Sequence, residues 1–420
     1  MGWHLNKGPD QLADFYPASQ FRKTLYRPDV IRRILQTGSV DRALEIADRE
    51  AGRATQKTDV AQVLPPQVKI TAPAAGETAA AEITVTAQAE SVGEHPVTAL
   101  RLLVDGRPYE GQKAIRRIES PKLGEAQADW SVVLTPGRHT LKVLADSAAS
   151  QGVSDELEIS YTAPDSKDEV QLPNLYVLAA GISKYPIDDL KLYYAASDAQ
   201  AFAGSFETHS KPLFGKIEVR LLTDEKATRK DLLEGLVWLR KEMTQRDVGL
   251  FFFSGHGDKD ADGNLYFLPV DVNPDILLAT AVSADQVSTS LKGLPGRVMA
   301  FFDACHSGGL DPNRRKAAGS LTDDLVRDLV TDESGLIVMC SSTGREFSVE
   351  SNAHRSGVFT LAITEGLSGK ADSNRDGAVY LNELDNYTTD RVKELTKGQQ
   401  HPVTAKPTTI RSFPLAKSGG

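Results

Sequence analysis

Cysteine is scarce in this chain, whose 420 residues include only Cys305 and Cys340. Two thiols cannot build a disulfide framework, so the sequence predicts a reducing compartment and a cytoplasmic location. Long apolar runs are also missing, since no stretch of about 18 uninterrupted apolar residues occurs. The residues after Met1 lack the cationic and then apolar pattern of a secretory signal. We therefore expect neither a secretory leader nor a membrane-spanning segment.

Positive charge is in deficit, because 48 Lys and Arg residues face 57 Asp and Glu residues and the formal net charge is −9. Proteins that bind nucleic acids or anionic membranes normally present a basic face, so neither kind of partner is expected. Apolar residues make up 40% and charged residues 25% of the chain, ordinary values for a folded protein. A length of 420 residues predicts two or three domains.

The pattern of apolar and polar residues divides the chain into three main regions. Residues 1–62 are predicted to be a helical N-terminal segment, with a helix that begins at Pro28 and stops at Gly38 and a second that begins at Val40. Residues 63–163 alternate apolar and polar positions at period two between turn dipeptides, which predicts an antiparallel β-sandwich. This part resembles bacterial immunoglobulin-like modules. Residues 164–172 are a polar linker, and 173–420 form the last domain.

The last domain alternates short apolar runs with amphipathic stretches. This alternation predicts a mostly parallel sheet that is covered by helices on both faces. In such a sheet the functional crevice is expected beyond the carboxyl ends of the strands. The expected strands are 175–180, 217–222, 248–253, 298–302 and 336–340. The expected helices between them are 197–208, 228–243, 283–292 and 357–366.

Two of these apolar runs end in chemically reactive sequences. The run at 250–253 continues as Ser254-Gly-His256-Gly, and the run at 298–302 continues as Asp303-Ala-Cys305-His306-Ser-Gly-Gly. A free cysteine has a pKa near 8.5, so an imidazole that accepts the thiol proton increases its reactivity. Neighbouring parallel strands would deliver Cys305 and His256 to the same edge of the sheet. This juxtaposition predicts nucleophilic catalysis by a cysteine.

The same residues carry a family resemblance. Ser254-Gly-His-Gly and Asp303-Ala-Cys-His-Ser-Gly resemble the paired signatures of caspase-like cysteine peptidases, particularly bacterial caspase homologues and metacaspases. The similarity extends over about 173–415. It implies a caspase-like three-layer α/β/α sandwich that follows an all-β immunoglobulin-like sandwich and a short helical segment.

The resemblance also implies roles for individual residues. Cys305 is the nucleophile and His256 the acid and base, while the backbone N–H groups of Gly257 and Cys305 form the oxyanion hole. His306 is adjacent to the nucleophile, and its side chain is expected to point elsewhere. In metacaspase-like enzymes the acidic residues that match Asp198 and Asp303 line the S1 pocket and select a basic residue.

Further features bear on specificity. Ser341 is expected in the same S1 pocket. Lys191 offers a cation in this neighbourhood, which would favour an acidic substrate residue instead. Asp198 has the alternative role of a helix N-terminal carboxylate that interacts with the helix dipole.

A basic, Gly- and Pro-containing segment follows the nucleophile. It includes Arg314, Arg315 and Lys316 and predicts an exposed loop. In caspase relatives activating cleavage occurs here, so an enzyme that prefers Arg would be able to process itself and the chain would be a zymogen. A simple solvated loop is the alternative.

A calcium-loop pattern occurs near the C-terminus. Asp372, Asn374, Asp376, Ala378 and Glu383 occupy the ligand positions of an EF-hand loop, with Gly377 at the sixth place. The spacing predicts Ca²⁺ binding, and an Asp-rich turn without metal is the alternative. The chemistry itself needs no cofactor.

Together these features predict a cysteine endopeptidase that hydrolyses peptide bonds after Arg or Lys. Its partners would be protein substrates and an upstream activating protease or regulatory protein. The alternative is a catalytically silent caspase-like scaffold that signals by binding proteins.

Overall fold

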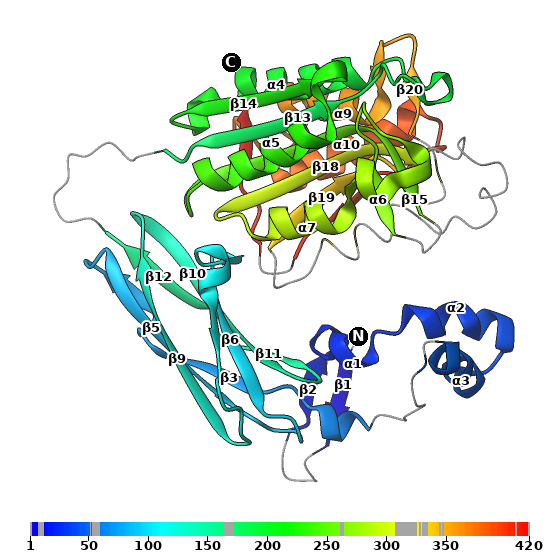
Figure 1. Cartoon of the computed structure of the whole chain (residues 1–420). Helices are drawn as coiled ribbons and strands as arrows, with labels where there is room; N and C mark the ends of the chain where they lie inside the picture. Colours follow the sequence, from blue (N-terminus) through cyan, green and yellow to red (C-terminus); the bar gives the residue numbers. More distant parts are fainter. Residues whose placement is uncertain are drawn as a thin grey trace. The chain divides into compact units, whose positions relative to one another are not determined.

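The structure is a computed structural model that describes residues 2–6, 12–50, 52, 59–162, 172–260, 264–306, 326, 329, 335–343, 346, 348–407 and 410–418 (Figure 1). The chain divides into two compact units. The first comprises residues 1–104 and 113–164, and the second comprises residues 105–112 and 165–420. Within the described residues, no helix has the length and apolar character needed to cross a membrane.

The N-terminal segment of the first unit contains more than the predicted helices. It begins with an antiparallel pair of short strands, and a short helical turn follows before the two predicted helices. Gly38 ends the first predicted helix with φ at 66°, a left-handed conformation that glycine adopts readily. The elements are β1 (Gly2–Leu5), β2 (Asp14–Pro17), η1 (Ala18–Phe21), α1 (Arg22–Leu25), α2 (Pro28–Thr37), α3 (Val40–Glu50) and η2 (Val60–Val63).

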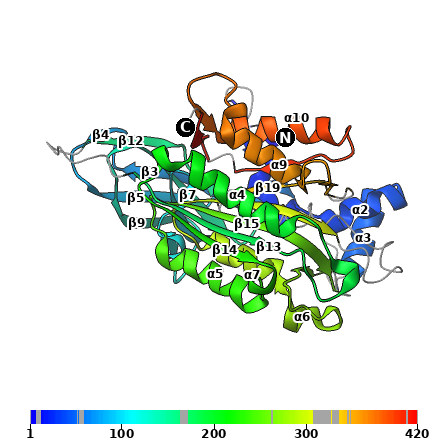
Figure 2. The same ribbon diagram turned by 90° about the horizontal axis from the view of Figure 1, so that it is seen from above.

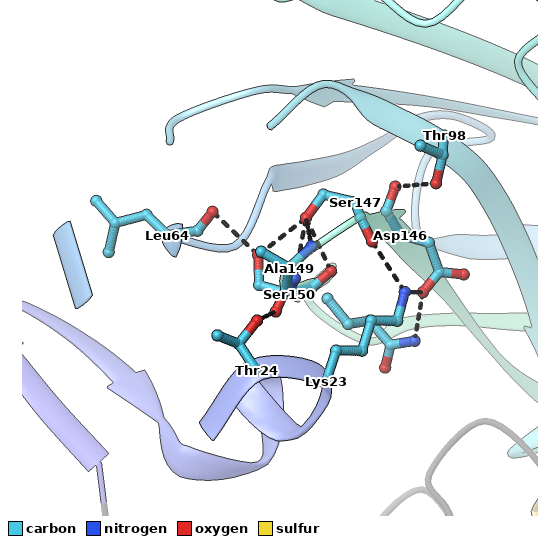
Figure 3. A network of polar contacts seen from close by, with 9 residues as sticks. Lys23, Thr24, Leu64, Thr98, Asp146, Ser147, Ala149 and Ser150 are labelled. Atoms are coloured by element: carbon cyan, nitrogen blue, oxygen red, sulfur yellow. Dashed lines mark hydrogen bonds and ion pairs between the residues drawn. The ribbon is translucent and has the colours of Figure 1, made fainter. Parts of the chain in front are cut away.

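This segment is attached to the β-sandwich by polar and apolar contacts. The Lys23 amine donates to the Asp146 carboxylate at 2.6 Å and to the Ser147 carbonyl at 3.1 Å, as Figure 3 shows. The Thr24 hydroxyl donates to the carbonyl of Ala149 at 2.6 Å. Phe21 is fully buried in the same cluster as Ala149. The segment around Phe21–Thr24 therefore packs against the sandwich.

The sandwich consists of two sheets that are antiparallel, as the period-two alternation predicts, except that the short strand β4 pairs with β12 in parallel. One sheet has the order β3-β5-β9, and the other contains the path β4-β12-β10-β6, with β8 on β6 and β11 on β10. Trp130 on β9 and Leu100 on β6 lie in the core between the sheets. The strands are β3 (Gln67–Ala72), β4 (Gly76–Thr78), β5 (Glu82–Glu90), β6 (Val97–Val104), β8 (Ile115–Arg117), β9 (Glu125–Val133), β10 (Gly137–Ser147), β11 (Gln151–Val153) and β12 (Leu157–Tyr161).

Residues 105–112, which include β7 (Arg107–Pro108), group with the second unit. Arg107 is 1% exposed, and its guanidinium donates to the carbonyls of Leu294 at 2.7 Å and Gly296 at 2.6 Å. Burial lowers the pKa of Arg107 to about 9. The second unit therefore includes a short stretch of chain that the sequence pattern assigns to the sandwich.

The second unit is built on a mostly parallel sheet with the order β14-β13-β15-β18-β19-β23. Only β23, at one end of this path, runs antiparallel to its neighbour. The short strands β16 and β17 extend the sheet from the end of β15. The bounds are β13 (Leu175–Gly181), β14 (Ile217–Thr223), β15 (Val248–Lys259), β16 (Leu265–Phe267), β17 (Val282–Ser283), β18 (Arg297–His306), β19 (Leu336–Cys340) and β23 (Val403–Ala405).

Helices cover both faces of this sheet, so the three-layer α/β/α arrangement is confirmed (Figure 2). Alternate residues of β13 point to opposite faces: Leu178 packs in the cluster with α5 and α7, and Val177 packs in the cluster with α4, α9 and α10. The helices are α4 (Ala195–His209), α5 (Arg229–Glu242), α6 (Leu277–Thr280), α7 (Ala284–Lys292), α9 (Val358–Glu365) and α10 (Leu381–Leu395). Shorter elements are η4 (Asp188–Leu190), η5 (Lys211–Leu213), η6 (Asp224–Lys226), η7 (Pro274–Ile276), η9 (Gly366–Lys370), β20 (Glu350–Ser351), β21 (Ser356–Gly357), β22 (Ala378–Tyr380) and β24 (Pro414–Lys417).

Candidate active site

Ser254-Gly-His256-Gly and the second reactive sequence as far as His306 belong to extended strands. The strand β15 continues through Ser254-Gly-His256-Gly to Lys259, and β18 continues to His306. The two strands are parallel and in register, with His256 opposite Cys305 and Ser254 opposite Asp303. The backbone therefore brings the histidine and cysteine positions side by side at the carboxyl end of the sheet.

His256 is buried, with 8% of its surface exposed, and its ring is held from one side. The ring Nε2 lies 3.0 Å from the Leu190 carbonyl oxygen, which can only accept, so Nε2 carries the proton. The other ring nitrogen, Nδ1, is buried and has no hydrogen-bond partner among the described residues. Burial lowers the pKa of His256 to about 4, against a smaller opposing effect of the Leu190 carbonyl. The imidazole is therefore neutral at pH 7 and presents a proton acceptor.

Tyr185 holds the backbone of His256. Its hydroxyl accepts the His256 N–H at 3.2 Å and donates to the Leu268 carbonyl at 2.9 Å. The Tyr185 and His256 rings also contact each other, with centroids 5.4 Å apart. A Cβ at Gly255 would lie 2.9 Å from the Tyr185 hydroxyl oxygen, so glycine at this position leaves room for the hydroxyl.

Two buried carboxylates lie beside this strand pair. Asp198, on the first turn of α4, is 2% exposed, and Asp303, on β18, is 6% exposed. An ideal Cβ on Gly357 would be 2.9 Å from an oxygen of each carboxylate, so both groups converge on the same glycine. Any larger residue at position 357 would collide with them. The structure therefore brings Asp198 and Asp303 together.

Neutral donors surround the two carboxylates. Asp198 accepts the Ser356 hydroxyl at 2.6 Å and the Gly357 N–H at 3.0 and 3.1 Å. Asp303 accepts the Ser348 hydroxyl at 2.7 Å and the Thr360 hydroxyl at 3.1 Å. Asp198 thus faces residues 356–357, which the simple helix-dipole interpretation does not require.

The pair is electrostatically unfavourable when both members are charged. Burial, reinforced by the charge of Asp303, raises the pKa of Asp198 to about 7. Burial likewise raises the pKa of Asp303. Within the described part of the chain, no cationic side chain forms an ion pair with either carboxylate. Among the residues that the structure describes, the Asp198–Asp303 pair therefore has no counter-ion.

The other residues proposed for this pocket have distinct positions. Ser341 is buried, and its hydroxyl is hydrogen-bonded to that of Ser348, which in turn donates to Asp303. Ser341 also hydrogen-bonds directly to the Asp303 carboxylate, which opposes the larger effect of burial on the pKa of Asp303. Lys191 is at the surface, where its amine donates to the Asp188 carboxylate at 2.5 Å, so it does not neutralise the pocket.

Some of the proposed residues cannot be placed. The side chains of Cys305 and His306 lie outside the described part of the structure, as do Arg314, Arg315 and Lys316. Gly257 follows His256 on β15, opposite His306 on β18 and Phe267 on β16. Its role in an oxyanion hole stays a prediction. Cys340 ends β19 and is 2% exposed in the core.

The calcium-loop sequence lies between η9 and α10, with β22 inside it. Asp372 accepts the N–H groups of Asp376 and Gly377, and Asn374 also accepts from Asp376. Glu383 accepts the Tyr380 N–H at 3.0 Å and the Ser373 N–H at 3.1 Å. Among the residues described, no group of three or more His, Cys, Asp or Glu side chains is placed to hold a metal ion. Calcium binding by Glu383 would therefore require it to exchange these backbone contacts.

Several residues that build the site carry no recognisable sequence signal. Ser348, Ser356 and Thr360 supply hydroxyl groups to the carboxylates, and Gly357 supplies space. Each lies in a segment that is far along the chain from β15 and β18.

Comparison with known proteins agrees with this architecture. The Caspase domain family matches residues 175–414, more than half of the chain, and the Bacterial Ig domain family matches residues 66–143. A metacaspase-1 of Scheffersomyces stipitis is 27% identical over 190 residues, which cover 37% of this chain and 46% of that protein. The chain thus spans less than half the length of this relative. This chain belongs to the caspase domain family.

Solved structures give weaker likenesses. A Geobacter sulfurreducens protein is similar over 56% of this chain and 94% of its own, with 15% identity and a TM-score of 0.40. Fibronectin(III)-like modules of Clostridium thermocellum CbhA cover 26% of this chain and 52% of their own, with 19% identity and a TM-score of 0.20. The family assignment and the immunoglobulin-like module therefore rest on sequence, and both confirm the predicted fold class.

The raised pKa of Asp198 predicts a pH-dependent cost to stability. An unfolded Asp has a pKa of about 3.9, whereas that of folded Asp198 is about 7. The folded state binds the proton more tightly between these values, so its stability falls as pH rises through this window. Asp198→Asn removes the charge and should raise the free energy of unfolding at pH 8 by about 2–4 kcal/mol relative to its effect at pH 4.

Thermal unfolding of both proteins from pH 4 to pH 8 measures this difference. Glu207→Gln is the matched control, because Glu207 is exposed on the same helix α4 and loses the same charge. The control should track the wild type at every pH. A pH-independent offset for Asp198→Asn would contradict the prediction.

Proposed function

We propose that this chain is a cysteine endopeptidase in which Cys305 is the nucleophile and His256 the acid and base. The observation that carries the proposal is the register of β15 and β18, which sets these two positions opposite each other. It is supported by the unpartnered Nδ1 of a neutral, buried imidazole. The family membership of residues 175–414 supports the same chemistry.

The proposed reaction has two stages. The Cys305 thiol transfers its proton to His256 Nδ1 as the sulfur attacks the scissile carbonyl carbon. The backbone N–H groups of Gly257 and Cys305 stabilise the resulting oxyanion. The imidazolium then protonates the leaving amine as the C–N bond breaks, which leaves a thioester. Water deprotonated by His256 hydrolyses the thioester, and the proton returns to the thiolate.

The Leu190 carbonyl has a defined part in these steps. Because it accepts from Nε2–H, it keeps Nδ1 as the basic nitrogen and holds the ring in one orientation. The low pKa of His256 makes its protonated form a strong acid towards the leaving amine. Proton uptake by this ring must therefore be concerted with attack by sulfur.

Substrate preference follows from the carboxylates. A P1 side chain of Arg or Lys would bring a positive charge to Asp198 and Asp303, which have no cationic partner in the described structure. Charge-assisted hydrogen bonds to the bound cation would offset the cost of burying the carboxylates. An acidic P1 residue would add a further negative charge. The pocket therefore favours cleavage after basic residues.

A panel of fluorogenic peptides that differ only at P1 tests activity and specificity together. We expect turnover of P1 Arg and Lys, little turnover of P1 Asp, and loss of at least about 10³-fold in kcat/KM for Cys305→Ala and His256→Ala. Ser288→Ala, a buried serine on α7, is a control outside the site. Faster cleavage after Asp would overturn the specificity. If wild type and Cys305→Ala cleaved the peptides at equal rates, the alternative of a catalytically silent scaffold would be favoured.

Cleavage within the segment around Arg314–Lys316 is the proposed route of activation. The prediction rests on the basic sequence, since this segment lies outside the described residues. Purified wild-type protein should accumulate fragments that end at Arg314, Arg315 or Lys316, whereas Cys305→Ala should stay intact, as intact-mass spectrometry would measure. Identical fragmentation of the two proteins would exclude self-processing and point to an upstream protease.

Calcium binding by the loop of Asp372, Asn374, Asp376, Ala378 and Glu383 remains a further proposal. A ligand that binds only the folded state raises the free energy of unfolding by about 2.7 kcal/mol when its concentration is about a hundred times its Kd. Calcium should therefore raise the melting temperature of wild type and leave that of Asp376→Ala unchanged. Magnesium in the same series is the control. An unchanged wild-type melting temperature would remove calcium from the mechanism.

A further inference from the structure

The strand β14 forms one edge of the parallel sheet, as Figure 1 shows. Among the described strands, β14 pairs only with β13, along the whole of Ile217–Thr223. An edge strand presents unpaired backbone N–H and C=O groups, so it can accept a further strand. Because β13 lies between β14 and β15, this edge is separate from the site that contains His256.

A groove of about 780 Å³ lies beside this edge. Part of its lining is apolar and comes from α5, namely Leu233, Val237 and Trp238. Val237 is 51% exposed, and the Trp238 ring packs edge-on against Tyr176 of β13, with ring centroids 5.9 Å apart. The other lining residues are charged: Arg220 of β14, Arg229, Lys230, Glu234 and Lys241 of α5, and Asp271. An exposed apolar surface that charged residues surround favours the binding of another molecule.

Positive charge is in excess in this groove, which has four Arg or Lys residues and two acidic ones. Arg220 and Lys230 share a single carboxylate, that of Glu234, and each lies 3.7 Å from it. Lys241 is exposed and forms no ion pair with any residue that the structure describes. Asp271 accepts the backbone N–H at the start of α5 at 2.9 Å. The groove therefore attracts negative charge, although the whole chain has a formal net charge of −9.

A second groove, of about 600 Å³, borders the same strand on the α4 side. Its charged lining residues are Lys211, Lys216 and Glu207, so it is also basic. The β14 side chains alternate between the two sides, since Ile217 packs with the α4 cluster and Arg220 lines the α5 groove. Successive side chains of an extended peptide also point to opposite faces. A strand added to β14 would therefore place alternate side chains in the two grooves.

We propose that the β14 edge and its two grooves bind an extended acidic segment of a partner protein, which joins the sheet as a further strand. In this mode of recognition, main-chain hydrogen bonds supply affinity and side chains in pockets supply selectivity. Acidic side chains of the segment meet the cations, and apolar ones cover Val237 and Trp238. The site goes beyond the proposed peptidase chemistry, because neither Cys305 nor His256 takes part in it.

Charge selects the occupant among the chains that could pair with β14. A second copy of this chain would set the same patch against itself, so Arg220, Lys230 and Lys241 would face their own copies. A basic segment would meet the same repulsion. The competing explanation is that the cations only protect an exposed edge from aggregation, as lysine does at other sheet edges. In that case an acidic peptide would be held by charge alone and would not need its backbone N–H groups.

The experiment measures the binding of labelled seven-residue peptides, which match β14 in length, to the full-length Cys305→Ala protein by fluorescence anisotropy. The acidic probe alternates Glu and Val, and the basic probe alternates Lys and Val. A third probe is the acidic peptide with every backbone nitrogen methylated, which keeps its charges but removes its N–H donors. We expect the acidic probe to bind with a Kd below about 1 mM. The other two should bind at least about tenfold more weakly.

Val237→Glu and Val237→Lys form a matched pair of variants, because both remove the same exposed apolar side chain and they differ in charge. The acidic probe should bind Val237→Glu at least about tenfold more weakly than Val237→Lys. Lys241→Gln should weaken binding by about threefold. Lys393→Gln, an exposed charge loss on α10, is the control and should leave binding unchanged. Melting temperatures that match the parent protein would show that the variants fold.

Each contrary outcome removes a defined part of the proposal. Equal binding of the acidic and basic probes would refute the charge selectivity, and equal binding of the methylated and unmethylated acidic probes would refute strand addition. Absence of binding by all three probes would overturn the proposal as a whole. If light scattering showed a dimer that Val237→Glu dissociates, the occupant would be a second copy and the acidic partner would be excluded. None of these outcomes depends on peptide cleavage, so a failure here is distinguishable from a failure of the proposed peptidase function.

Discussion

The parallel pairing of β15 with β18 is the constraint on which the site depends. The two strands match residue for residue from Val248 opposite Arg297 to Gly257 opposite His306. Along both strands alternate side chains enter opposite apolar layers, as Phe252 and Phe253 do. A slip of one residue would turn every apolar side chain to the wrong layer. Core packing therefore enforces the register, and the register sets His256 opposite Cys305.

Core packing stabilises the pairing of β15 with β18, whereas the burial of Asp198 and Asp303 is unfavourable for stability. Asp198 and Asp303 are buried side by side, and neutral hydroxyl and N–H donors only partly compensate their charge. Burial without a cation is unfavourable for ionised carboxylates, which is why the pKa of each is raised. Under the proposed specificity, a basic substrate side chain would supply the positive charge that the described residues around this pair lack.

Glycine and hydroxyl residues make this pocket physically feasible. Gly357 has no Cβ, so two carboxylates can approach its backbone from different elements. Gly255 similarly leaves room for the Tyr185 hydroxyl, which holds the backbone of His256. These small contacts position the chemistry, while the large apolar side chains of the sheet and its helices hold the strands that carry it.

Much of the architecture was accessible from the sequence. Apolar runs located all five central strands, and Pro28 and Gly38 marked both ends of α2. The two reactive sequences identified His256 and Cys305 because each directly follows an apolar strand. The strand β1, its partner β2 and the grouping of residues 105–112 with the second unit escaped prediction. Short strands and single buried contacts such as those of Arg107 leave no periodic signal.

The sequence by itself determined the class of fold and predicted the pair of Cys305 and His256, since both inferences depend on local patterns of apolar and reactive residues. Only the tertiary structure decided how the pocket is assembled. Asp198, Asp303 and Gly357 come from three different elements, and their convergence depends on how α4, β18 and β21 pack. Charge repulsion, burial and the space beside a glycine are properties of that packing, and no spacing along the chain encodes them.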